Sequence, residues 1–282
     1  MVLDPRHDED VCVRHLVELG YVDPAESAFH DAQRRRQLKT ELEHAIDLTR
    51  QGRAGEAVEP LQRLAGMYPD AAPPRQLLAE IHFSAGNLAA ADDDLQWLTH
   101  HSVVTPRLAM MAAAIALERG DAEAARHDLE YACHVEPSLA GVQSLLGTAH
   151  LRLRQWELAE VCFNQAIGRN AGDARGLAGL ATVALHRRQF EEAADWALQA
   201  LEHDMRLYRA HYCLGIALAC LDRPDAAREA FAAASRLDSS QAAPLCWLSR
   251  IARKQGDLER AAAYRAQALA IIRRRRSRAR RP

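Results

Sequence analysis

An alanine recurs every 34 residues from Ala57 to Ala261, and this periodicity limits the possible folds more than any other feature of the chain. The series contains no insertion or deletion, and its members are Ala57, Ala91, Ala125, Ala159, Ala193, Ala227 and Ala261. A fixed period of this length predicts a row of similar repeats, because a single repeat of about 34 residues cannot bury an apolar face by itself.

Two further sets of positions follow the same register. A turn is predicted five residues before each alanine, at Gly52, Gly86, Gly120, Arg154, Arg188, Asp222 and Gly256. Four of these seven residues are glycine, which readily adopts the positive φ found at helix ends. Apolar or small residues follow most of the alanines by four and by seven positions, which places them on one helical face. Each repeat is therefore predicted to be two antiparallel amphipathic helices.

The first helix of six repeats also carries an apolar residue followed by a small one, as at Leu146-Gly147 and Leu180-Ala181. Together with the turn glycine and the alanine of the second helix, this pattern resembles the tetratricopeptide repeat (TPR) family. The resemblance implies an all-α fold in which antiparallel helix pairs stack into a right-handed superhelical solenoid. The seven expected repeats are residues 38–71, 72–105, 106–139, 140–173, 174–207, 208–241 and 242–275.

Residues 1–37 precede the repeats. A short amphipathic helix is predicted for residues 8–20, and a second helix is predicted to start at Pro24, after the N-cap Asp23, and to continue into the first repeat. Residues 13–23 also resemble the segment that precedes the TPR tail of bacterial phosphodiesterase/sulfatase-like proteins. This second resemblance implies an alternative, in which the chain is a separate regulatory or substrate-recruiting tail of such an enzyme or of a transferase.

Residues 276–282 are expected to be a basic C-terminal tail. The arginines that follow Ile271, without any acidic residue, are Arg273, Arg274, Arg275, Arg276, Arg278, Arg280 and Arg281. Nucleic-acid binding through this tail is a further alternative, which is disfavoured because the tail lacks aromatic side chains for base stacking. Cations at the end of the last helix also have a simpler role, since they interact favourably with the helix dipole.

No motif in the sequence indicates catalysis: a P-loop, a GxGxxG after a strand, HExxH and GxSxG are all missing. We therefore expect a non-enzymatic protein without a cofactor or a metal. Cys213, Cys220 and Cys246 lie near one another in the repeat register, which would suit a soft-metal or redox site, but buried free thiols are the preferred interpretation. The pair His100-His101 is interpreted as a solvated helix end.

The composition also predicts a compartment. No segment has 18 uninterrupted apolar residues, and acidic residues near Met1 do not suit a secretory signal, so a membrane span is not expected. The six cysteines form no CxxC pair, which favours a reducing compartment. Among the 36 basic residues only Lys39 and Lys254 are lysines, which indicates a GC-rich bacterial genome. The expected location is the cytoplasm.

The TPR resemblance also implies a binding surface, since positions 2, 5, 9, 12 and 13 of the first helix of a repeat commonly face the ligand, and positions 2, 5 and 9 provide the candidates. The candidate residues at these positions are Arg107, Met110, Ser144, Thr148, Arg175, Thr182, Arg209, Tyr212, Ile216 and Arg250. The expected function is that of a scaffold or adaptor that binds a protein or peptide segment, and the arginines favour a segment with acidic and apolar side chains. The lysine and asparagine pair by which some members clamp a chaperone's C-terminal carboxylate is missing.

Overall fold

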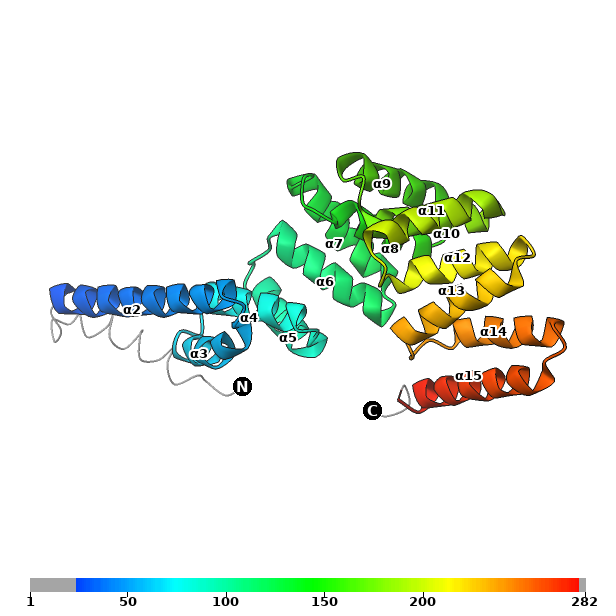
Figure 1. Cartoon of the computed structure of the whole chain (residues 1–282). Helices are drawn as coiled ribbons and strands as arrows, with labels where there is room; N and C mark the ends of the chain where they lie inside the picture. The colour runs from blue at the N-terminus through cyan, green and yellow to red at the C-terminus, as the bar shows by residue number, and fades with distance from the viewer. Residues whose placement is uncertain (1–23, 279–282) are drawn as a thin grey trace. The chain divides into compact units, whose positions relative to one another are not determined.

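The computed structural model describes residues 24–278, with side chains for residue 33 and residues 36–274. In this range the chain forms fourteen helices and no strand (Figure 1). The chain divides into two compact units, unit 1 at residues 1–104 and unit 2 at residues 105–282. Residues 1–23 lie outside the described part of the chain. The helix at residues 8–20 and the resemblance of residues 13–23 to phosphodiesterase/sulfatase-like proteins therefore stay predictions.

The helices of unit 1 are α2 (Pro24–Arg50), α3 (Ala54–Met67), α4 (Ala72–Ser84) and α5 (Leu88–His100). With 27 residues, α2 confirms the prediction of a helix that runs from Pro24 into the first repeat without a break. α3 packs against α2 and α4, and α5 packs against α4. Leu61, Leu64 and Leu78 are buried where these helices meet.

Unit 2 consists of five successive helix pairs. The helices are α6 (Pro106–Arg119), α7 (Ala122–Val135), α8 (Val142–Arg152), α9 (Trp156–Arg169), α10 (Ala174–His186), α11 (Phe190–His203), α12 (Tyr208–Cys220), α13 (Pro224–Leu237), α14 (Ala243–Lys254) and α15 (Leu258–Arg278). Within unit 2, helices that follow one another in the chain pack against each other, as the stacked ribbons in Figure 1 show. The predicted fold class, an all-α solenoid of antiparallel helix pairs, is confirmed.

Every predicted turn site adopts a positive φ. The values are +76° at Gly52, +75° at Gly86, +88° at Gly120, +60° at Arg154, +63° at Arg188, +55° at Asp222 and +83° at Gly256. Residues with a Cβ rarely adopt this conformation. The turn is therefore a property of the repeat, and it persists at the three sites where the sequence has replaced glycine.

The recurring alanines lie where the two helices of a pair cross. Six of the seven have no exposed surface, and Ala261 in the last helix is 7% exposed. Two phenylalanines fill the space beside them: Phe163 of α9 and Phe231 of α13, both fully buried. A methyl group at this crossing leaves room for the partner helix, whereas a longer side chain would separate the helices.

Glycines on the first helices make room for these phenylalanines. A Cβ on Gly147 of α8 would lie 2.5 Å from the Phe163 ring, and a Cβ on Gly179 of α10 would lie 2.4 Å from the same ring. A Cβ on Gly215 of α12 would likewise lie 2.7 Å from the ring of Phe231. One buried ring of α9 therefore touches the backbone of the helix before it and of the helix after it.

We predict that Ala227→Leu destabilises unit 2 by about 1–3 kcal/mol, because the larger side chain overpacks the crossing of α12 and α13. The matched control is Ala226→Leu, at the adjacent and exposed position of the same helix, which should leave stability nearly unchanged. Thermal melts followed by circular dichroism compare the two variants. Equal melting temperatures would contradict the packing described here.

We also predict that Gly179→Ala lowers the melting temperature, since the added methyl group must displace the buried ring of Phe163. The control is Gly168→Ala in α9, where a Cβ meets nothing within 4 Å and where alanine favours the helix by up to about 1 kcal/mol. The two variants should therefore shift the melt in opposite directions. A stabilising Gly179→Ala would show that the ring does not occupy this position.

Candidate functional site

The first helices of the pairs in unit 2 form one continuous surface. α6 contacts α8, α8 contacts α10, and α10 contacts α12, while a second helix such as α9 packs between the two first helices that flank it. We call the solvent-facing side of α6, α8, α10, α12 and α14 the A-helix face. These five helices carry all the residues that the sequence predicts for partner binding.

Aromatic rings form a chain of contacts on the part of this face that α12 and α14 provide. The rings of Tyr208 and Tyr212 stack at 5.9 Å between centroids, and Tyr212 meets Phe231 edge to face at 5.9 Å. Phe231 in turn stacks on Trp247 at 5.6 Å, and the guanidinium of Arg250 lies over the indole ring at 5.2 Å. These five residues are called the aromatic–arginine cluster.

The cluster joins the core of unit 2 to its surface. Phe231 is fully buried, Tyr212 and Trp247 are half-buried against it, and Arg250 is exposed. Burial raises the pKa of the Tyr212 hydroxyl, and a hydrogen bond with Trp247 acts in the opposite direction. The rings are therefore held in place by packing and still offer edges to a partner.

Arg209 lies one residue after Tyr208, in the first turn of α12, and is half-buried. Its pKa is lowered mainly by burial, and the charge of Arg152, at the end of α8, lowers it further. The guanidinium of Arg152 donates a hydrogen bond to the backbone oxygen of Leu117 in α6.

The structure also shows which of the predicted residues are engaged elsewhere. Ser144 is only 1% exposed, and its hydroxyl donates a 2.6 Å hydrogen bond to Asp173, which also caps α10 by accepting from Gly176 N. The prediction that Ser144 faces a partner is therefore wrong, because Ser144 connects α8 to the start of α10. Thr148 and Thr182 are half-buried and donate to backbone oxygens one turn earlier in their own helices.

The remaining predicted residues differ in exposure. Arg107 and Arg175 are exposed in the first turns of α6 and α10, whereas Met110 is half-buried against the core formed by α6 to α9. Ile216 is half-buried beside Phe231. The structure thus brings Arg209, Tyr212, Ile216 and Arg250 to adjacent helices, and it places Arg107 and Met110 at the other end of unit 2.

Sequence reasoning missed two residues of this region, Arg152 and Tyr208. Arg152 occupies position 13 of its repeat, which commonly faces the groove in the family, so the repeat register could have indicated it. Tyr208 is the first residue of α12 and has no equivalent signal. It belongs to the surface because its ring stacks on Tyr212, a contact that only the structure reveals.

The three cysteines of this region do not share one environment. Cys213 is buried and lies 3.4 Å from the hydroxyl of Thr182, whereas Cys220 and Cys246 are exposed. The interpretation as buried thiols is confirmed for Cys213 and wrong for Cys220 and Cys246, because the last residue of α12 and the outward side of α14 face solvent. Among the residues described, no group of His, Cys, Asp and Glu side chains suits a metal ion.

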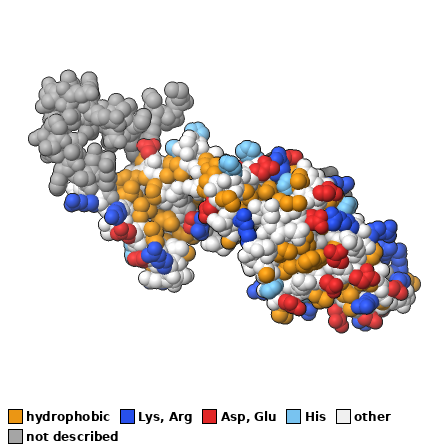
Figure 2. Space-filling model, turned by 90° about the horizontal axis from the view of Figure 1, so that it is seen from above, with side chains coloured by type: hydrophobic (Ala, Val, Ile, Leu, Met, Phe, Trp, Pro, Cys, Tyr) orange, Lys and Arg blue, Asp and Glu red, His pale blue; other side chains and the backbone are white. Residues whose placement is uncertain are grey.

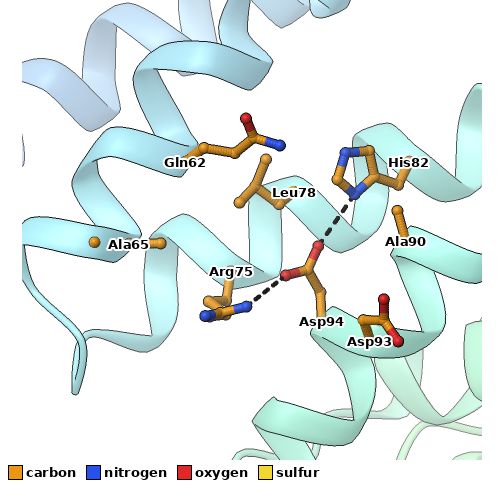
Figure 3. A pocket seen from close by; sticks show the side chains of 9 residues that line it. Gln62, Ala65, Arg75, Leu78, His82, Ala90, Asp93 and Asp94 are labelled. Atoms are coloured by element: carbon orange, nitrogen blue, oxygen red, sulfur yellow. Dashed lines mark hydrogen bonds and ion pairs between the residues drawn. The ribbon is translucent and has the colours of Figure 1, made fainter. Parts of the chain in front are cut away.

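Unit 1 contains a separate pocket of about 340 Å³ between α3, α4 and α5 (Figure 3). The nearly buried carboxylate of Asp94 accepts hydrogen bonds from Arg75 and pairs with His82 Nδ1, each at 3.1 Å. The guanidinium carbon of Arg75 also lies 5.0 Å from the centre of the Trp97 ring. The ring of His101 stacks on Trp97, with 3.8 Å between the two ring centroids. Arg75, His82 and Asp94 thus connect α4 to α5.

One face of the molecule mixes charges of both signs. Figure 2 shows acidic, basic and histidine side chains interspersed on the face in view, with apolar side chains between them. On the second helices of unit 2, Leu158, Val161 and Leu198 are about half exposed. None of the helices in the described part of the chain has the length and apolar character that crossing a membrane requires.

Comparisons with known proteins agree with this architecture. The tetratricopeptide repeat family model matches residues 144–210, which extend from α8 into α12. A tetratricopeptide repeat protein from Parabacteroides merdae is 18% identical over 84% of this chain and 93% of its own, with a TM-score of 0.62. The APC/C hetero-tetramer Cut9–Hcn1 provides a chain that is 16% identical over 75% of this chain and 42% of its own, with a TM-score of 0.66.

A thermophilic TPR protein from Thermus thermophilus is 20% identical over 59% of this chain and 91% of its own, with a TM-score of 0.52. None of the curated proteins compared with the chain matches it. At identities of 16–20%, these comparisons show that the chain and the three solved structures share a fold. The residues that match the family model carry the same 34-residue register and turn geometry as the helices from α3 to α15, so this array shares the fold of the solved tetratricopeptide repeat structures.

Proposed function

We propose that this chain is a non-enzymatic interaction scaffold, which binds a protein or peptide segment on the A-helix face of unit 2. The aromatic–arginine cluster is the observation that carries this proposal. Its rings are fixed by the buried Phe231, and Tyr212, Trp247 and Arg250 reach the surface beside one another. Tyrosine, tryptophan and arginine are the side chains that most often dominate the energy of protein interfaces.

The charge of this face supports a partner segment with acidic and apolar side chains. In the part of the chain that the structure describes, Arg175, Arg209 and Arg250 form no ion pair with a carboxylate. Guanidinium groups bind carboxylates through two parallel hydrogen bonds, and the neighbouring rings provide apolar contact area. An extended segment with acidic residues spaced among apolar ones would satisfy both.

The stacked helices also suit this role mechanically. Successive first helices contact each other directly, so that side chains of α8, α10 and α12 keep fixed positions over a long surface. A partner segment that lies across these helices would meet a surface that is already ordered. Binding to such a surface requires little conformational entropy from the scaffold.

A random dodecapeptide library displayed on phage and selected against the immobilised chain would test the proposal. We predict that selected peptides, once synthesised, bind the double variant Arg175→Glu/Arg250→Glu at least tenfold more weakly than the wild type. Both positions are exposed, so the reversal of charge should leave the thermal melt within a few degrees. The measurement is a peptide titration by fluorescence anisotropy.

The matched control is Arg223→Glu/Arg236→Glu, which changes the charge equally at exposed positions before and within α13. These positions lie away from the A-helix face, so peptide affinity should stay near the wild-type value. Peptides that lose affinity for the control variant and keep it for Arg175→Glu/Arg250→Glu would contradict the proposed location of the binding surface.

A further inference from the structure

We infer that the pocket between α3, α4 and α5 of unit 1 binds a primary ammonium group carried on an aliphatic chain (Figure 3). Nε2 of His82 is the hydrogen-bond acceptor in this inference, and the carboxylate of Asp93 is the counter-charge. The ammonium group can belong to a lysine side chain of a partner or to a free diamine. The site lies in unit 1, so it does not rest on the function proposed for the A-helix face of unit 2.

The buried carboxylate of Asp94 orients the ring of His82. Asp94 is 5% exposed, accepts a 3.1 Å hydrogen bond from Arg75 and pairs with Nδ1 of His82 at the same distance. A carboxylate that accepts from both neighbours leaves the ring hydrogen of His82 on Nδ1. In the neutral imidazole, Nε2 then carries a lone pair and can only accept a hydrogen bond. The pair therefore presents one acceptor in a fixed orientation.

Nε2 of His82 is open to the pocket. Among the described residues it has no hydrogen-bond partner, and it is not one of their buried atoms that lack a partner, so solvent reaches it. Figure 3 shows this nitrogen on the side of the ring away from Asp94, toward Gln62 of α3, which also lines the pocket. A ligand that enters the pocket can therefore donate to Nε2 without displacing Asp94.

The charge that remains uncompensated in the pocket is negative. Arg75 and Asp94 neutralise each other through their ion pair. Asp93 also lines the pocket, is exposed, and has no hydrogen-bond or ion-pair partner within the described range of the chain. An anionic ligand would face this carboxylate and the lone pair of His82, whereas an ammonium group supplies a positive charge and three N–H donors.

The walls beside these acceptors suit an aliphatic chain. Leu78 and Ala65 are buried, and Ala90 is half-buried. The pocket volume of about 340 Å³ is at the lower end of the range of about 300–1,000 Å³ that ligand pockets occupy. The methylene groups of a lysine side chain or of a diamine would lie on this apolar wall, while the ammonium group meets His82 and Asp93.

The same place in unit 2 shows that these polar groups are particular to unit 1. Three repeats further along, a smaller pocket of about 140 Å³ lies between α9, α10 and α11. There Trp196 occupies the repeat position of Asp94, and Ala184 occupies that of His82. An apolar filling is thus compatible with the repeat. Since packing does not require the acid and the imidazole in unit 1, their presence in the larger pocket favours a ligand.

NMR spectroscopy of the full-length chain, labelled with 15N in its histidine rings, tests the inference. The probes are Nα-acetyllysine methylamide and cadaverine, each titrated while the Nε2 resonance of His82 is observed. Two comparison compounds are made from the lysine probe. Trimethylation of its side-chain nitrogen keeps the charge and removes the N–H donors, whereas acetylation removes the charge.

In the free chain we expect a hydrogen on Nδ1 of His82 and none on Nε2. Both amines should shift the Nε2 resonance, and the trimethylated and acetylated compounds should bind at least tenfold more weakly than the lysine probe. Tighter binding of cadaverine identifies a free diamine as the better ligand, and tighter binding of the lysine probe identifies a protein side chain.

Two pairs of variants locate the site. Ala90→Met fills the pocket and should weaken binding at least tenfold, whereas Ala89→Met, at the adjacent exposed position of α5, should bind like the wild type. Asp93→Asn should weaken binding at least threefold, whereas Asp47→Asn, which removes an exposed carboxylate of α2 outside the pocket, should have little effect. The melting temperatures of all four variants should stay within a few degrees of the wild type.

Several results would overturn the inference. A hydrogen on Nε2 of His82 in the free chain would remove the acceptor. Equal affinity for the lysine probe and its trimethylated form would show attraction by charge alone. Unchanged affinity in Ala90→Met, or no binding of either amine to the wild type, would show that the pocket is not an ammonium site.

Discussion

The close crossing of two helices over residues no larger than alanine is the constraint on which the structure depends. Ala227 has no exposed surface, and Gly215 on the facing helix leaves space for the ring of Phe231. Helices that approach this closely expose few backbone groups and bury a narrow apolar stripe from each partner. Since no single pair can cover its own stripe, each pair requires the next one, and the chain becomes an array of pairs.

The same packing produces the candidate binding surface. Phe231 belongs to the core of α12, α13 and α14, yet Tyr212 and Trp247 rest on it and carry its order to the surface. A partner would therefore meet rings whose conformations are already restricted. Arg209 follows Tyr208 in the first turn of α12 and is half-buried.

Much of the fold could be predicted because the repeat averages over local exceptions. Arg154, Arg188 and Asp222 replace glycine at the turn, and their φ is nevertheless positive, as the register predicts. The division between unit 1 and unit 2 near residue 104 could not be foreseen, because the alanine register continues from Ala91 to Ala125 without a change.

The candidate site was only partly predictable, since the register indicates which helix face a residue occupies and not which partners it finds. Ser144 has the position of a ligand-facing residue, but Asp173 accepts its hydroxyl hydrogen bond and buries it. Phe231 and Trp247 belong to successive repeats, and the stacking of their rings depends on how α13 packs against α14. Contacts between repeats are therefore the part of the site that requires the structure.

Site-specific photo-crosslinking in the native cell tests most directly the claim that the A-helix face of unit 2 is the binding surface. A benzophenone amino acid would replace the exposed Arg250 of α14 in one variant and the exposed Leu198 of α11 in another. The account predicts that the probe at position 250 forms a discrete adduct with a partner protein and that the probe at position 198 does not. Adducts that form at position 198 and not at position 250 would contradict it.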